Sequence, residues 1–373
     1  MKQIIIALVA IFLLTGSCFA AQSEETPTVE EDVITAQSDA LDLDGLERAA
    51  GEHGAGLDLE DGIDWEQGLQ NLIDTGSEQL SGVLRKAVHS AVLLLVIVLL
   101  GALAEHFCGE LGQKNLSVVR IVVVLAIMTV AVSDANSLMN LGREAIRGMQ
   151  TFANILLPTM TAATAAMGAP LSATARQLAT LLFSDLLINL IDFLLLPLVY
   201  AYLATCAGYA AVGNDGLKRI GKLIKGVVTG VLTTVLILFI GYLTISGAIA
   251  GSSDALTLKA TKFAMTSMVP VVGKILSDAA ETVLAGAGIL RSTVGVFGMI
   301  VVLGILLTPF LQLGIHYLAY KVSSAVGATV ADGRTSGLID GIGDAFGLVL
   351  GMAGSCAVLL LISIVSAVTV VVR

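Results

Sequence analysis

The stretch from Leu178 to Ala210, LATLLFSDLLINLIDFLLLPLVYAYLATCAGYA, decides the fold class. An α-helix rises about 1.5 Å per residue, so about 20 apolar residues cross the roughly 30 Å of hydrocarbon in a bilayer. Other apolar stretches of this kind are Val88 to Leu103, Val118 to Val132, Val227 to Ile249, Val294 to Leu318 and Phe346 to Val372. The sequence therefore predicts an all-α, polytopic helical membrane protein with about six spans.

Composition and charge support this fold class. Hydrophobic residues make up 56% of the chain and charged residues 13%, whereas soluble proteins contain about 25% charged residues. Residues 21–80 contain 17 acids and one base, and residues 81–373 contain 13 acids and 18 bases. We therefore expect an acidic N-terminal arm attached to a weakly basic membrane body.

The N-terminus has the features of a targeting segment. Lys2 precedes an apolar run from Ile4 to Leu14, which is too short to span a bilayer comfortably. Small residues around Ala20 match a signal-peptide cleavage site, so residues 1–20 are predicted to be a signal peptide. Lipidation of Cys18 is the alternative, although Thr15 occupies the position where leucine is usual.

Two different segments are predicted between the signal peptide and the first span. Residues 21–60 are acidic and poor in aliphatic side chains, so we expect a disordered, extracytoplasmic arm. In residues 61–86, apolar side chains such as Trp65 and Leu69 recur at helical spacing among acids. This pattern predicts an amphipathic helix at the membrane interface.

Proline spacing indicates an internal repeat. Pro158 and Pro197 are 39 residues apart, and so are Pro270 and Pro309. In each block the second proline lies inside an apolar stretch, which is followed by a polar turn and another apolar stretch. The predicted units are a first hairpin at 87–135 and two parallel repeats at 136–251 and 252–373.

Two further segments, Phe152 to Met167 and Ala264 to Leu290, are shorter or more polar than the spans. Basic side chains between Lys218 and Lys225 form the densest basic cluster, which we expect to be cytoplasmic because basic loops resist translocation. From an extracytoplasmic N-terminus, three crossings place this cluster in the cytoplasm and four would place it outside. Both segments are therefore predicted to be proline-led and non-spanning or re-entrant.

Three residues on the third span form a candidate polar membrane face. Asp185, Asn189 and Asp192 lie at positions i, i+4 and i+7, which share one side of a helix. An ionisable group in the bilayer costs about 2.5 kcal/mol or more, so this side must meet protein or water. Two interpretations stay open: the lining of a conduit or proton-linked site, and an interfacial aspartate with Asn189 bonded to a neighbouring helix.

A second candidate site begins at Pro270. Pro270, Gly273, Asp278 and Glu281 lie in an amphipathic segment that is too polar to span easily. The two carboxylates are one helical turn apart, which favours an edge facing a partner or a pore mouth. A solvated interfacial helix without a special role is the alternative.

Small residues at helical spacing form a third group of candidates. Glycines four residues apart let membrane helices approach closely, which is the expected role of Gly226, Gly230, Gly343, Gly347 and Gly351. An interface between copies of the chain is the alternative.

Motifs of enzyme sites are missing from the sequence. The histidines His53, His89, His106 and His316 have no metal-binding spacing, and the cysteines are scattered. No phosphate-binding loop of the G-x-x-x-x-G-K-[ST] type is present. We therefore expect no enzymatic activity, no cofactor, no metal and no nucleic-acid partner.

The run from Met268 to Leu284, MVPVVGKILSDAAETVL, resembles the stage III sporulation protein AE family of endospore-forming bacteria. The resemblance implies a non-enzymatic integral membrane subunit of a channel or secretion-like complex that links mother cell and forespore and is required for late forespore development. It places the chain in the mother-cell membrane around the forespore.

Partners follow from the same resemblance. It implies other stage III sporulation membrane proteins, including an ATPase subunit and ring-forming subunits. Membrane lipid is expected from the apolar spans, and a homo-oligomer is the alternative that the glycine spacing offers. An autonomous secondary transporter or permease for a small solute is the alternative, because duplicated units and intramembrane carboxylates such as Asp185 are features of transporters.

Overall fold

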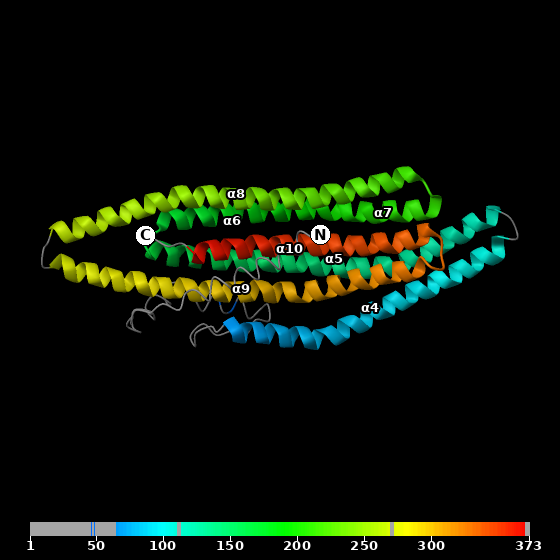
Figure 1. Ribbon diagram of the computed structural model, residues 1–373, viewed down its shortest axis with the longest axis horizontal. Helices are drawn as coiled ribbons and strands as arrows, with labels where there is room; N and C mark the ends of the chain where they lie inside the picture. Colours follow the sequence, from blue (N-terminus) through cyan, green and yellow to red (C-terminus); the bar gives the residue numbers. More distant parts are fainter. Residues whose placement is uncertain (1–45, 47, 49–64, 110–112, 269–271, 370–373) are drawn as a thin grey trace.

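The computed structural model describes residues 46, 48, 65–109, 113–268 and 272–369. The predicted signal peptide and Pro270 lie outside these residues, as does nearly all of the predicted acidic arm. The described chain is an elongated bundle of long helices (Figure 1).

The helices are α4 (Trp65–Gly109), α5 (Gln113–Ala166), α6 (Pro170–Leu190), the π-helical segment η1 (Ile191–Leu195), α7 (Leu196–Val212), α8 (Asp215–Met268), α9 (Val272–Gly327) and α10 (Gly333–Val368). α6, η1 and α7 follow one another without a break, so together they form one continuous span. Six helices of the described chain are long and apolar enough to cross a membrane. The prediction of an all-α, polytopic membrane protein with six spans is confirmed.

The proline-led segments differ from the prediction. The residues from Phe152 onward continue α5 through Pro158, and the segment from Ala264 onward is divided between the end of α8 and the start of α9. Hydroxyl groups of Thr159 and Thr161 donate to backbone carbonyls one turn back, at 3.1 and 2.7 Å. Such local hydrogen bonds help membrane helices to continue through proline, so the first segment is neither separate nor re-entrant.

The segment expected at the membrane interface also belongs to a longer helix. From Trp65 onward it is continuous with the first span in α4. The Thr308 hydroxyl of α9 donates to Gln79 Oε1 at 3.0 Å, and a Cβ on Gly76 would lie 3.5 Å from Leu307. The described part of this segment is helical and packs along α9, and its position at the membrane interface stays a prediction.

The chain forms three hairpins that run in the same direction. The turns α4/α5, α7/α8 and α9/α10 lie toward one end of the bundle, and α5/α6 and α8/α9 are connected toward the other (Figure 1). A parallel repeat requires this course, although the duplication itself stays a prediction. Hereafter the end with the three hairpin turns is called the inner end.

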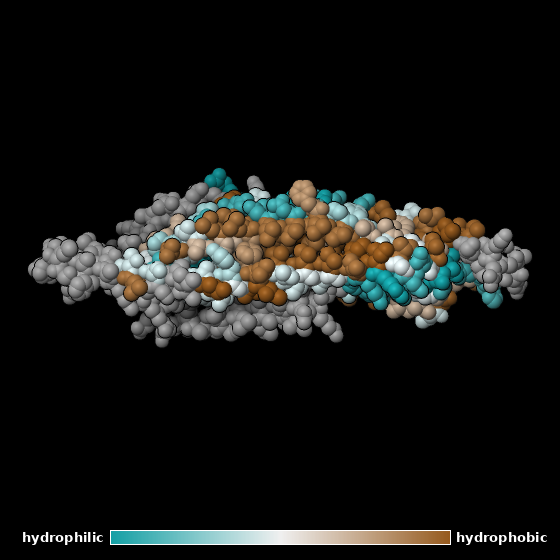
Figure 2. All heavy atoms as spheres, turned by 90° about the horizontal axis from the view of Figure 1, so that it is seen from above, coloured by the Kyte–Doolittle hydropathy of each residue, from teal (hydrophilic) through white to brown (hydrophobic). Residues whose placement is uncertain are grey.

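The last hairpin forms the centre of the bundle. In the most apolar 18 residues of each helix, 78% of the residues of α10 and 67% of those of α9 are buried, compared with 28% for α8. The outer helices cover this hairpin and expose apolar side chains, which gather over the middle of the face in Figure 2. A polar solvent would disfavour such a broad apolar surface, whereas lipid accommodates it.

We expect the three hairpin turns to be cytoplasmic. In a background without Cys108, Cys206 and Cys356, cysteine at Asn214 or Thr329 will react with a membrane-impermeant maleimide only from the cytoplasm, because basic side chains surround these turns. Cysteine at Ala166, toward the other end of the bundle, will react only from the opposite side. Labelling of Asn214 and Thr329 from opposite sides would contradict the six-span topology.

Candidate functional site

A row of polar side chains follows the exposed side of α5. Its spacing of three or four residues, with one adjacent pair, keeps it on one side of the helix. We call this row the α5 polar face: Ser133, Asn136, Ser137, Asn140, Glu144, Arg147, Thr151 and Asn154, all exposed. It lies in the half of α5 beyond the apolar stretch that ends at Val132.

The aspartates predicted from sequence bind α5 side chains within or beside this face. Asp192, in η1, forms an ion pair with Arg143, whose Nε lies 3.1 Å from the carboxylate, and accepts a hydrogen bond from Arg147 Nη2 at 3.3 Å. Gln150 Nε2 donates to Asp185 Oδ1 at 2.9 Å. The aspartates therefore meet protein, as the membrane argument requires, and Asn189 lies exposed between them on the same helix.

Charged side chains of the α5 polar face point away from the bundle. One carboxylate, Asp192, binds two guanidinium groups, and the Arg147 side chain is 62% exposed. The π-helical turn widens the helix where Asp192 projects, a local feature that is frequent at functional sites. Sequence analysis missed Arg143 and Arg147 because they lie beyond the apolar stretch of α5. The four-residue spacing of these two basic residues is the sequence feature that could have identified them.

A second charged cluster joins three helices at the inner end. Asp344 of α10 accepts from Lys225 of α8 at 2.6 Å and from Lys321 of α9 at 2.9 Å, and its side chain is 10% exposed. Lys321 also contacts Asp340 at 2.7 Å. The Tyr202 hydroxyl of α7 donates to Asp344 at 3.4 Å, which brings a fourth helix into the cluster.

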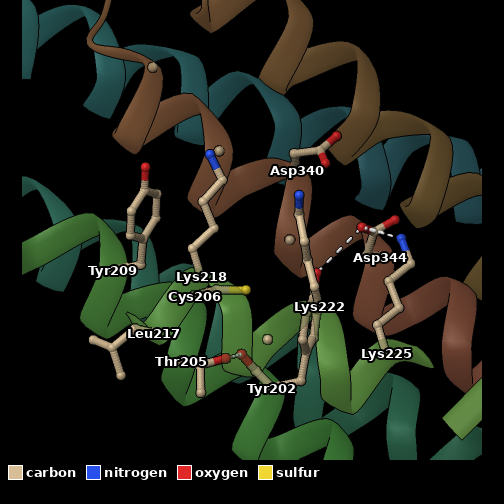
Figure 3. Close-up of a pocket in the computed structure, with 14 residues that line it drawn as sticks. Tyr202, Thr205, Cys206, Tyr209, Leu217, Lys218, Lys222, Lys225, Asp340 and Asp344 are labelled. Carbon is tan, nitrogen blue, oxygen red and sulfur yellow. Dashed lines mark hydrogen bonds and ion pairs between the residues drawn. The ribbon is translucent and has the colours of Figure 1, made fainter. Parts of the chain in front are cut away.

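Beside this cluster α7, α8 and α10 enclose a cavity of about 300 Å³ (Figure 3). Its lining residues are Tyr202, Thr205, Cys206, Tyr209, Leu217, Lys218, Gly221, Lys222, Lys225, Gly333, Gly337, Asp340, Gly341 and Asp344. From sequence, the α8 lysines indicated only the orientation of the chain in the membrane. The carboxylates at Asp340 and Asp344, one turn apart, were the signal that could have indicated the site.

The candidate packing glycines fall into different environments. A Cβ on Gly343 would lie 3.2 Å from Tyr320 Cβ, so this glycine does allow α9 and α10 to approach closely. A Cβ on Gly226, Gly230 or Gly351 would meet no atom of the described chain within 4 Å. For these three, packing within one chain is not confirmed, because their backbones border open space. Gly347 is buried in α10.

The remaining candidates are only partly described. Gly273, Asp278 and Glu281 lie in the first turns of α9, but their side chains, like Pro270, are outside the description, so the edge they were predicted to form stays a prediction. Within the described residues, no group of three or more His, Cys, Asp or Glu side chains could hold a metal ion.

Comparison with known proteins matches most of the chain, including the run that contains Pro270. A family model described as stage III sporulation protein AE matches residues 60–371. Stage III sporulation protein AE of Bacillus subtilis (strain 168) is 25% identical over 205 residues, which cover 55% of this chain and 51% of that relative. The match thus spans about half the length of the curated relative. No solved structure matches. Because the family match extends over most of the chain, the protein belongs to the stage III sporulation protein AE family.

Proposed function

We propose that this protein is a non-enzymatic membrane subunit of a channel or secretion-like complex that links mother cell and forespore during sporulation. Family membership supports the sporulation role. The observation that favours a conduit is the α5 polar face, because it is polar, exposed and part of a helix that also spans the membrane.

The length and charge of the α5 polar face support water as its neighbour. From Ser133 to Asn154 the face extends about 30 Å at about 1.5 Å per residue, close to the thickness of bilayer hydrocarbon. Each charged group in lipid would cost about 2.5–3.5 kcal/mol at mid-bilayer. Glu144 and Arg147 would therefore be strongly disfavoured if this face met lipid, and an aqueous path shared with other subunits removes that cost.

In this proposal the protein acts only within a larger assembly. The sequence has no phosphate-binding loop, so energy for transport comes from an ATPase subunit, and ring-forming subunits extend the path beyond the membrane. Further copies of the chain and other stage III sporulation membrane proteins would close the conduit around the α5 polar face. The complex lies in the mother-cell membrane that surrounds the forespore.

The alternative is an autonomous transporter of a small solute. The inner-end cavity favours it, because its lining comes from both predicted repeats: Tyr202 and Lys222 from the first, Asp340 and Asp344 from the second. Transporters place substrate sites between such repeats. Purification in detergent separates the two functions: a stable complex with sporulation proteins supports the channel subunit, whereas stabilisation of the isolated protein by a solute supports the transporter.

Cysteine labelling in sporulating cells tests the conduit. In the cysteine-free background, Arg147→Cys will react with a charged, membrane-impermeant thiol reagent in the assembled complex, because water reaches the α5 polar face. Ile237→Cys is the matched control: Ile237 is 62% exposed and lies on α8 within the apolar stretch from Val227 to Ile249. If both cysteines resist the reagent, or both react equally, the α5 polar face does not line a water-filled path.

A further inference from the structure

The inner-end cavity has the size of a small-ligand site. Its volume of about 300 Å³ lies at the lower end of the usual range for such pockets. Gly333 and Gly337 contribute backbone to the lining, and a Cβ on either would meet no described atom within 4 Å. The absence of side chains at these positions keeps the space beside α10 open.

Positive charge is in excess in this cavity. The two carboxylates, Asp340 and Asp344, are already paired with Lys225 and Lys321. Two more lysines line the cavity, and within the described residues neither Lys218 nor Lys222 has a carboxylate at ion-pair distance. Lys218 instead lies over the Tyr209 ring, with Nζ 5.3 Å from the ring centroid. Two ammonium groups therefore remain available to an anion.

Helix geometry directs these lysines to one place. Lys218, Lys222 and Lys225 occupy positions i, i+4 and i+7 of α8 and all line the cavity, whereas Arg219 does not. Figure 3 shows Lys218 and Lys222 projecting from α8 toward α10, with Lys222 beneath Asp340. A ligand held here would contact both ammonium groups from the same side.

We propose that this cavity binds a phosphate ester. A phosphate presents several anionic oxygens, so it can bridge two ammonium groups, and lysine is a common point-charge binder of phosphate. The cavity lies near the α7/α8 and α9/α10 turns, so a phospholipid headgroup and a soluble phosphate ester are both candidate ligands. The two sources share this chemistry.

Binding to purified, full-length protein in detergent tests the site. The probes are phosphatidylglycerol, measured against phosphatidylcholine by native mass spectrometry, and glycerol phosphate, measured by thermal stabilisation. Lys222→Gln will raise the dissociation constant about tenfold or more, because it removes one charge-assisted contact. Arg219→Gln removes the same charge from the neighbouring, non-lining position and will change it less than about twofold.

Asp340→Asn is expected to change the affinity in the opposite direction to Lys222→Gln. It removes negative charge from the cavity, so affinity for the bound probe will rise, an effect that general destabilisation would not produce. Binding of phosphatidylglycerol alone identifies a lipid headgroup as the source, and binding of glycerol phosphate alone identifies a soluble ester; both support the site. Binding of neither probe, or equal weakening by Lys222→Gln and Arg219→Gln, overturns it.

Discussion

Asp344→Asn will lower the free energy of unfolding by up to about 3 kcal/mol, the cost of removing a buried, charged hydrogen-bond partner from lysines that are themselves part-exposed. The Asp344 carboxylate binds Lys225 at 2.6 Å and Lys321 at 2.9 Å while its side chain is 10% exposed. Asparagine keeps the shape of the side chain but removes its charge. Lys225 then has no carboxylate partner among the described residues, and its charge stays only partly hydrated.

Asp340→Asn is the matched control for this prediction. Asp340 lies one turn earlier on α10 and contacts the same Lys321 at 2.7 Å, but its side chain is 47% exposed. Exposed ion pairs contribute about 1 kcal/mol or less. Thermal unfolding in detergent will therefore show a large loss for Asp344→Asn and a small one for Asp340→Asn. Equal losses would show that burial of Asp344 does not hold the four helices together.

The membrane fold could be predicted from sequence because apolar length is a local property. Stretches such as Leu178 to Ala210 exceed the thickness of a bilayer without reference to any other part of the chain. Helix ends could not be predicted in the same way. α5 continues past Val132 with Asn140, Arg147 and Asn154 on its exposed side, and hydropathy treats such polar residues as the end of a span.

The charged contacts depend on packing that a single sequence does not encode locally. Spacing within one helix groups Asp185 with Asp192, but their partners Gln150, Arg143 and Arg147 lie 35 to 49 positions earlier, on another helix. At the inner end, Lys225 and Asp344 are 119 residues apart. These pairs depend on which helices pack side by side. The apolar side chains do not specify that packing, because they interact as favourably with lipid as with another helix.

Glycine spacing does not identify the neighbour of a helix, for a related reason. Glycines four residues apart show that one side of a helix lacks side chains. They do not show whether that side meets another helix of the same chain. Gly226 and Gly230 have that spacing and border open space, whereas a Cβ on Gly298 would lie 2.7 Å from Leu156. The sequence alternative of an interface between chains therefore stays open for Gly226 and Gly230.

Gly343→Leu will destabilise the protein by about 3 kcal/mol or more, at the upper end of the range for overpacked cores. A Cβ at Gly343 would lie 3.2 Å from Tyr320 Cβ and 3.5 Å from the Tyr317 carbonyl oxygen. Because one contact is with backbone, a rotamer change cannot make room for a leucine. The side chain will instead separate α9 from α10, which are the two most buried spans, and will draw Lys321 away from Asp344.

Gly226→Leu separates this packing effect from the effect of the substitution itself. Both changes replace a helical glycine by a better helix former, which favours the folded state by up to about 1 kcal/mol. Only Gly343 has a close neighbour, so thermal unfolding of detergent-purified Gly226→Leu will be unchanged or occur at higher temperature. Equal stability of the two variants would refute close contact at Gly343. If Gly226→Leu unfolds normally but no longer copurifies with other copies of the chain, then the smooth side of α8 meets another subunit, which the structure of one chain leaves uncovered.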